Sequence, residues 1–295
     1  MSEMLRGFLV SIHCPSEEYL TVTINCSSLS PSTYMQLVNQ LQDALSDIDT
    51  MYAEKEPKGR SLKARYRRIT ANERQRMLKF SPFPSRILNK LKYIRAKAYY
   101  ILNSCCVSIT SIESGFYREK AYALPESFAD EFITKMNTLN NEINEIREFI
   151  RSFDYSSIEL ILSRYDLSIP KREFGIPDIR VDLIPISFAM AIEEWASKSE
   201  KVKQLLVRKQ EELIKSVIDG IKERLEPIVK TIEGERNMKK IRERLEEINS
   251  IADGLGLKSI SKSVIIPLIE SLENPEKLGM KPSEFVSSRI ASLFK

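Results

Sequence analysis

The sequence predicts a mostly helical fold, in which a small N-terminal β-hairpin packs on an elongated helical body with a coiled-coil-like helical hairpin. Three observations predict this fold. The 295 residues include only 9 Gly against 45 Lys or Arg and 41 Asp or Glu, which is typical of long helices rather than a turn-rich β fold. Two short segments near the start are rich in β-branched residues. Apolar residues recur at heptad spacing in the second half.

The N-terminal strands are expected within residues 5–14 and 19–25. The sequence PSEE between them is a plausible turn, so the two segments predict a β-hairpin. Such a hairpin would have to pack on helices, because two strands alone are marginally stable. A first helix should begin after Ser30, with Pro31 in its first position, and continue to about Tyr52.

The next elements alternate short breaks with amphipathic helices. Thr70 and Glu73 have the spacing of a capping box, which predicts a short helix over about 71–79. The sequence SPFPS at 81–85 should end it and introduce a longer helix with an apolar face. Further helices are expected at about 126–153 and 156–165.

The domain organisation follows from one Pro-rich stretch. Residues 166–185 contain three Pro and one Gly, and they predict an irregular crossover. A crossover of that length inside a compact domain usually packs against something or moves. We therefore divide the chain into an N-terminal domain at 1–165, the crossover at 166–185, and a helical-hairpin region with C-terminal helices at 186–295.

The second half predicts a helical hairpin. Helical patterning is nearly continuous over 187–232, and Pro227 should kink or end this helix. The heptad spacing resumes at Met238, which predicts a second, antiparallel arm. Glycines at 253–259 should cap that arm, and two helices should follow at about 260–273 and 282–294. The apolar residues that carry the spacing are Ile214, Ile218, Ile221, Leu225, Ile228, Ile232, Met238, Ile241, Leu245, Ile248 and Ala252.

The sequence holds no recognisable catalytic motif. Gly254 and Gly256 lie two positions apart after a helical pattern, unlike the glycines of a nucleotide-binding P-loop. His13 is the only His and stands in a predicted strand without a nucleophile elbow. Asp178 and Asp182 are the least ordinary acidic pair, because loops often carry function. We expect no catalytic residue, no cofactor and no metal site.

The four cysteines indicate a reducing, cytoplasmic location. They show no C-x-x-C spacing and no disulfide framework. Cys14 and Cys26 could form a bridge across the predicted hairpin, but buried reduced thiols are the simpler interpretation. Cys105 and Cys106 are adjacent, which is a poor geometry for one tetrahedral metal. No apolar run approaches the length that a bilayer requires, and the first residues do not resemble a signal peptide, so we expect no membrane contact.

The charge distribution is the most uneven feature of the sequence. Residues 58–97 contain fourteen Lys or Arg and one acid, Glu73, which gives this basic segment a charge of +13. The whole chain carries +4, so the other 255 residues carry −9. One region should therefore be strongly positive within a mildly negative body.

Three interpretations of the basic segment remain open. It could bind nucleic-acid phosphates, with aromatic side chains available for stacking. It could meet an acidic surface of a protein partner or of a second copy. It could pair with the protein's own acidic helices, such as 126–148. The residues expected to contact nucleic acid or an acidic partner are Lys63, Arg65, Tyr66, Arg67, Arg68, Arg74, Arg76, Lys79, Arg86, Lys90 and Arg95.

Two segments carry a resemblance to a known family. They are SPFPSRILNKLKYIRAKAYYIL at 81–102 and FYREKAYALPESFADEF at 116–132, with Tyr-Ala-Leu-Pro-Glu at 122–126 as the sharpest motif. This order resembles a family of phage, plasmid and archaeal-virus proteins called domain of unknown function 3150, and the resemblance covers most of 5–273. The family has no established activity. Its genes often lie beside MoxR-type AAA+ ATPases, which implies an accessory subunit of an ATP-driven remodelling system.

These observations predict a non-enzymatic accessory or structural protein, and the resemblance implies that it belongs to a virus, plasmid or other mobile element. It would act through protein contacts or self-association along its helical arms, because heptad spacing within 202–252 offers a long surface. A MoxR-type AAA+ ATPase is the implied partner. The alternative is a nucleic-acid-binding protein that contacts phosphates through 58–97.

Overall fold

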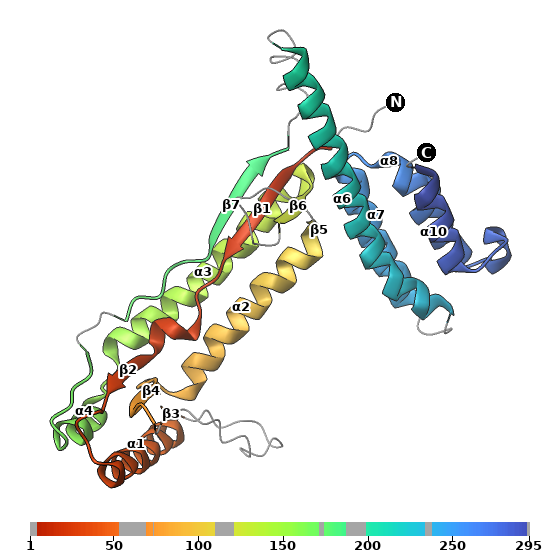
Figure 1. Ribbon diagram of the computed structural model, residues 1–295. Helices are drawn as coiled ribbons and strands as arrows, with labels where there is room; N and C mark the ends of the chain where they lie inside the picture. The colour runs from red at the N-terminus through yellow and green to blue at the C-terminus, as the bar shows by residue number, and fades with distance from the viewer. Residues whose placement is uncertain are drawn as a thin grey trace. The chain divides into compact units, whose positions relative to one another are not determined.

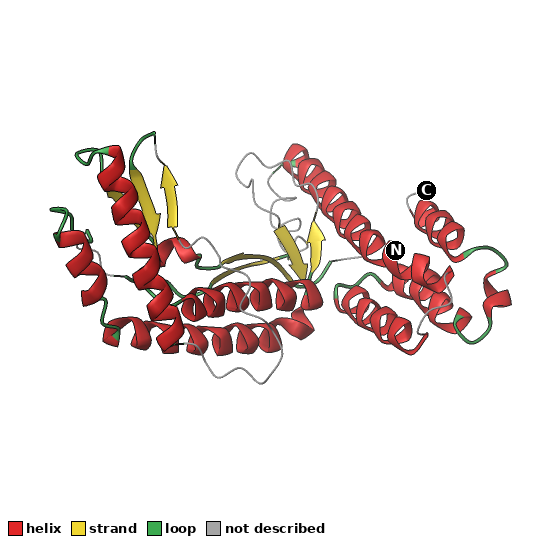
Figure 2. Ribbon diagram, turned by 90° about the horizontal axis from the view of Figure 1, so that it is seen from below, coloured by secondary structure: helices red, strands yellow, loops and turns green. Residues whose placement is uncertain are grey.

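The computed structural model describes residues 5–52, 69–72, 74–109, 121–170, 174–186, 199–233 and 238–293 (Figure 1). Helices predominate among them, and the strands form two small antiparallel sheets (Figure 2). The mostly helical prediction is therefore confirmed. The chain divides into two compact units, each assembled from separate segments. Unit 1 comprises the segments Met1–His13, Tyr99–Lys135 and Arg180–Lys295. Unit 2 comprises the segments Cys14–Ala98 and Met136–Ile179.

Unit 1 is built on a four-stranded antiparallel sheet with the order β5-β6-β1-β7. Its strands are β5 (Val107–Ile109), β6 (Ala121–Leu124), β1 (Phe8–His13) and β7 (Arg180–Pro185). β7 corrects the expectation of an irregular crossover over all of 166–185, because its last six residues pair with β1 from end to end. Pro185 fits at the end of an edge strand, where its missing N–H removes no ladder bond.

Helices account for the rest of unit 1. The helical hairpin expected from the heptad spacing is present, because α6 (Glu200–Glu233) and α7 (Met238–Gly254) pack side by side (Figure 1). Its apolar residues from Ile214 to Ala252 lie in or against one core, apart from Met238, which is exposed. The remaining elements are α8 (Lys258–Ile260), a π-helical turn (Ser261–Ile265), α9 (Ile266–Ser271), η4 (Pro275–Leu278) and α10 (Pro282–Leu293).

Two signals for helix ends had different outcomes. The glycine cap is confirmed, because Gly256 has a φ of 83° and Leu257 donates its N–H to the carbonyl of Ala252 at 2.9 Å, as in a Schellman motif. Pro227, in contrast, does not end α6, which continues to Glu233. A proline inside a helix removes one backbone hydrogen bond, and the packing of the following turn against the core compensates for that loss.

The helix expected at 260–273 is divided into three pieces. Pro267 has no N–H to donate to the carbonyl of Ser263, so the regular α-helical ladder cannot continue through this point. The turn immediately before it, Ser261–Ile265, is π-helical. Its side chains Val264 and Ile265 are fully buried in the core of unit 1, which keeps the irregular turn in place.

Unit 2 combines a three-stranded sheet with helices. The strand order is β2-β4-β3, from β2 (Val22–Asn25), β4 (Met77–Phe80) and β3 (Ile69–Asn72). The helices are α1 (Pro31–Met51), α4 (Ser156–Ser163), and the parts of α2 (Ser85–Cys105) and α3 (Ala129–Ser152) that belong to this unit. An aromatic cluster fixes the break before α2, because the ring of Phe83 contacts those of Phe153, Tyr155 and Phe174.

The predicted N-terminal hairpin is wrong, although both of its strands exist. β1 pairs with β6 and β7 in the sheet of unit 1, whereas β2 pairs with β4 in the sheet of unit 2. The 3₁₀ helix η1 (Glu17–Leu20) occupies part of the expected turn. A β-rich sequence specifies extended backbone but not its partner, and here both edges of β1 are taken by strands distant in sequence.

The helix expected over 71–79 is also wrong, because β3 and β4 form a hairpin there. In β4 the side chains of Leu78 and Phe80 are buried while Lys79 between them is exposed, which is the two-residue period of a strand. Arg76 adopts a φ of 49° in the turn. Pairing of β4 on both edges outweighs the local capping signal.

Candidate interaction surfaces

The residues proposed as a basic contact surface fall into two groups. Lys63, Arg65, Tyr66, Arg67 and Arg68 lie outside the described residues. The others belong to unit 2, at the β3–β4 hairpin and on α2. The described cations of segment 58–97 are Arg74, Arg76, Lys79, Arg86, Lys90, Lys92, Arg95 and Lys97.

Two lysines of α2 pair with carboxylates of α3. Lys90 Nζ lies 2.6 Å from Glu145 Oε2, and Lys97 Nζ lies 2.9 Å from Glu142 Oε1. The hydrogen bond to Glu142 raises the pKa of the Lys97 ammonium above its ordinary value. These acids stand on the helix that the sequence offered as an internal partner for the basic segment.

Two further lysines pair with the short η1 helix. Lys92 Nζ lies 3.4 Å from Glu17 Oε1, and Lys79 Nζ lies 3.7 Å from Glu18 Oε1. All four side chains are at least partly exposed, so each pair contributes only about 0–1 kcal/mol. Their effect is to balance the local charge of unit 2, since each cation is matched by an acid nearby.

The arginines use other contacts. The Arg86 guanidinium lies 5.2 Å from the ring centroids of both Tyr52 and Phe149, which is cation–π distance. Arg76 donates a hydrogen bond to the carbonyl of Leu29. Arg74 and Arg95 are exposed. Most described cations of the basic segment therefore contact their own unit.

The acidic pair of the expected crossover is held by arginines. Arg147 Nη2 donates to Asp178 Oδ1 at 2.8 Å, and Arg180 Nη2 donates to Asp182 Oδ2 at 2.9 Å. The hydrogen bond from Arg180 lowers the pKa of the Asp182 carboxyl, so this acid is ionised at neutral pH. His13 Nε2 lies 3.3 Å from the same carboxylate. Such ion pairs are the ordinary way to stabilise surface acids near a strand.

The thiols show no sign of activation. Cys14, Cys26, Cys105 and Cys106 are all free, and only Cys14 is partly exposed. Burial raises the pKa of the Cys14 thiol to about 11 and that of Cys106 still further. Within the described residues, no group of three His, Cys, Asp or Glu side chains could hold a metal ion.

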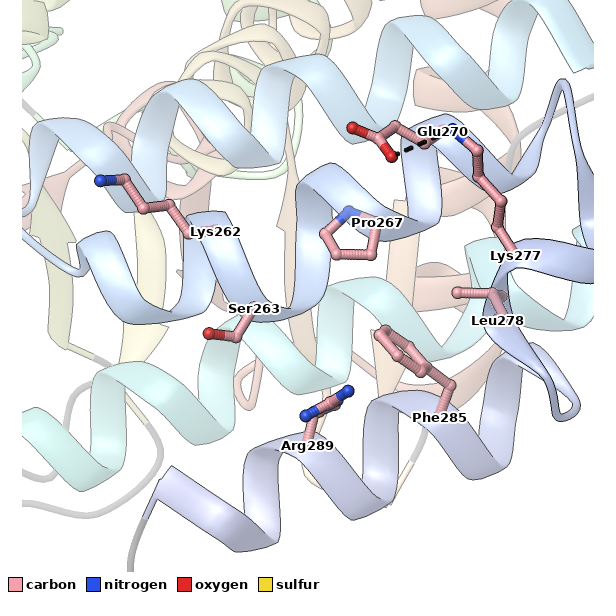
Figure 3. A pocket seen from close by; sticks show the side chains of 8 residues that line it. All are labelled: Lys262, Ser263, Pro267, Glu270, Lys277, Leu278, Phe285 and Arg289. Carbon is pink, nitrogen blue, oxygen red and sulfur yellow. Dashed lines mark hydrogen bonds and ion pairs between the residues drawn. The ribbon is translucent and has the colours of Figure 1, made fainter.

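Unit 1 has a shallow hollow of about 370 Å³ beside α9 and α10 (Figure 3). Lys262, Lys277 and Arg289 line it together with Glu270 and the ring of Phe285. Lys277 Nζ lies 3.4 Å from Glu270, the Arg289 guanidinium stacks 5.5 Å from Phe285, and Lys262 points away from the others in Figure 3. These charged groups are exposed and do not converge on one point, so the hollow does not have the arrangement of a ligand site.

The start of α6 is the surface that stands out in unit 1. We call residues Glu200–Glu212 the α6 arm; none of them is buried, whereas Leu213 and many residues after it lie in the core. Val202, Leu205 and Leu206 form an apolar stripe along this arm, at the spacing of one helical face. Leu205 is 56% exposed and the other two are half-buried. The arm therefore extends the amphipathic helix α6 beyond the part that is buried in the core.

The lengths of the two hairpin helices explain why α7 does not cover the arm. α6 has 34 residues and α7 has 17, so an antiparallel α7 can lie beside only the second half of α6. Figure 1 shows the first turns of α6 extending past the end of α7. The heptad spacing indicated a long helical surface, but it could not indicate which part of that surface stays uncovered.

Comparison of the chain with models of protein families, with curated proteins and with solved structures finds no match. Each helix in the described part of the chain is too short or too polar to cross a membrane. The function must therefore be argued from the surfaces of the molecule.

Proposed function

We propose that this protein is a non-catalytic accessory or structural protein that acts through protein contacts, with the α6 arm as its contact surface. The observation that carries the proposal is the apolar stripe of Val202, Leu205 and Leu206, in which Leu205 is 56% exposed and the other two are half-buried. An apolar stripe on a projecting helix gains free energy when a partner covers it, at about 25 cal/mol per Å² of apolar surface buried. Helix-on-helix contact is a common way to recognise such a stripe.

The chemistry of the described residues favours a binding role over catalysis. The most suggestive acids, Asp178 and Asp182, are paired with arginines, and burial raises the pKa values of the Cys14 and Cys106 thiols. Catalytic groups are usually found with pKa values matched to their task and beside a ligand-sized pocket. The proposal therefore places the function on a surface rather than in a cleft.

The resemblance to the domain of unknown function 3150 family suggests a partner. Its gene neighbours are MoxR-type AAA+ ATPases, so we propose that this chain serves such an ATPase as an accessory subunit in a virus, plasmid or other mobile element. The α6 arm would supply the docking helix for that subunit contact.

The test combines the purified chain with a purified MoxR-type ATPase. Light scattering and pull-down should show a complex, and Leu205→Glu should weaken it at least tenfold by placing a charge in the stripe. Leu160→Glu is the matched control, because Leu160 lies on α4 in unit 2 with a similar exposure of 59%. A chain that binds neither the ATPase nor a copy of itself would overturn the proposal.

Nucleic-acid binding through 58–97 stays a prediction, and its support rests mainly on residues outside the described part of the chain. The +13 charge of the segment favours it, whereas the ion pairs of Lys79, Lys90, Lys92 and Lys97 weaken it. Phosphate binding should fall steeply with salt concentration. Reversing the charges of Arg65, Arg67 and Arg68 should weaken binding to any nucleic-acid sequence, and affinity indifferent to both changes would exclude this function.

A further inference from the structure

We propose that the α6 arm is covered by the α6 arm of a second copy of this chain, running antiparallel, so that the protein forms a reversible homodimer. The inference rests on the proposed function, because it assigns a second copy of this chain to the same contact surface. It follows from the extent of the arm and from the placement of its charges.

The extent of the arm fixes the register of the pair. Leu213 is 4% exposed and belongs to the core of unit 1, so a second helix can cover α6 only over Glu200–Glu212. An antiparallel pair that uses this whole segment is centred on its midpoint, Leu206. Leu205 and Leu206 then pack against the same residues of the other copy, and Val202 comes opposite Lys209 and Gln210.

The charges beside the stripe select the antiparallel direction. Lys201 and Glu212 stand eleven positions apart, close to three helical turns, so they lie on the same flank of the stripe at opposite ends of the arm. In an antiparallel pair, Lys201 of each copy meets Glu212 of the other, twice by symmetry. In a parallel pair in register, this flank would meet the opposite flank of the other copy and bring Lys201 near Lys203, which is repulsive.

Most of the other charged groups of the arm are compatible with this pairing; the exception is Arg208, which stands on the flank of Lys201 and comes near Arg208 of the other copy. Glu200 and Glu211 lie on the side of the helix away from the stripe, and Lys203 comes opposite the neutral Gln210 of the other copy. Lys209 continues the line of the stripe, and its ammonium donates to Glu212 of its own chain at 2.6 Å. Its alkyl stem can cover apolar surface while the charge stays with that carboxylate.

The size of the contact predicts a weak dimer. About three and a half helical turns on each copy bury less surface than the roughly 1,200 Å² of a standard interface. We therefore expect a dissociation constant on the order of 10–100 µM, with rapid exchange between monomer and dimer. Dilution should return the monomer of 34.0 kDa.

Sedimentation velocity of the full chain, over about 1–500 µM, tests the proposal through a charge swap. Lys201→Glu or Glu212→Lys alone should weaken the dimer about tenfold, because each places like charges together at both ends of the contact. The double variant Lys201→Glu/Glu212→Lys should return to within about threefold of the original affinity. Glu211→Lys is the matched control: it makes the same charge change one residue away, on the outer side, and should have little effect.

Each outcome decides the inference. A chain that stays monomeric at 500 µM overturns it, and so does a dimer that the double swap fails to restore. Circular dichroism of each variant should show unchanged helix content, so that a weakened dimer is not confused with unfolding. If the chain is monomeric but binds the MoxR-type ATPase in a Leu205-dependent way, the second copy is excluded while the proposed function stands.

Discussion

Helices α2 and α6 are both long, amphipathic and rich in charge, yet they present very different surfaces. Along the unit 2 part of α2, Ile87, Leu91, Ile94 and Ala98 are all buried, and Lys90, Lys92 and Lys97 are paired with acids. In α6 the apolar face is buried only from Leu213 onward. An excess of charge therefore does not by itself mark a contact surface, because ion pairs within one unit can account for it.

The largest expected effect tests the covered half of α6. A Cβ at Gly220 would lie 2.1 Å from the carbonyl oxygen of Ser108 and 2.6 Å from Val107 Cγ1, so Gly220→Ala should push α6 away from β5. We expect a loss of about 2–4 kcal/mol in the free energy of unfolding, despite the better helix propensity of Ala. Urea unfolding measures it, with Gly175→Ala as control, because no heavy atom lies within 4 Å of that position. If both variants were equally stable, α6 would not pack closely against β5 at Gly220.

The next effect compares two leucines of the same helix. Leu225→Ala should lower the free energy of unfolding by about 2–3 kcal/mol, because Leu225 is fully buried and its removal leaves a cavity. Leu205→Ala should change it by less than about 0.5 kcal/mol at a concentration low enough to keep the chain monomeric. Thermal unfolding of the two variants at 1 µM measures the difference. A large loss for Leu205→Ala would show that the arm is covered within one chain.

A smaller effect is expected for the charges of α2. Removing the Lys97–Glu142 pair with Lys97→Met and Glu142→Gln should give a coupling free energy of about 0–1 kcal/mol in a double-mutant cycle. The pKa of Lys97 is higher in the folded protein than in the unfolded chain. The contribution of this ion pair to the free energy of unfolding is therefore fully present below the pKa of the unfolded chain, and it is lost as the pH rises through the pKa of the folded protein. Unfolding measured from pH 8 to 11 should show that loss in the parent but not in Lys97→Met. A pair that contributes equally at pH 8 and 11 would contradict this interpretation of the charges.

The helices show what could be predicted from local sequence. The positions of α1, α3 and α4 follow from apolar spacing and from Pro at a helix start, and the glycine cap after α7 follows from Gly256. Helical bonds and caps connect residues close in sequence, so local patterns suffice for them. The capping box at Thr70 failed because β4 gains two strand partners, one of them more than fifty residues away.

The surfaces were harder to predict than the elements. For Lys90 and Arg86 the sequence left an external partner and internal pairing open, and the structure shows contacts with Glu145 and with two aromatic rings. The heptad spacing pointed to a helical contact surface, and its uncovered part proved to be the α6 arm. Neither outcome can be read from composition, because both depend on which elements meet.

The sequence by itself determined the helical class of this protein, the extent of most of its helices and the uneven placement of its charge, since these depend on composition and on contacts within a few residues. Only the tertiary structure decided that β1 and β2 belong to different sheets, that acids neighbour the lysines of α2, and that α7 leaves the first turns of α6 uncovered. The physical reason is the same in each case: strand pairing, ion pairing and helix packing join residues far apart in the chain, and their outcome depends on every surface that competes for the same partner.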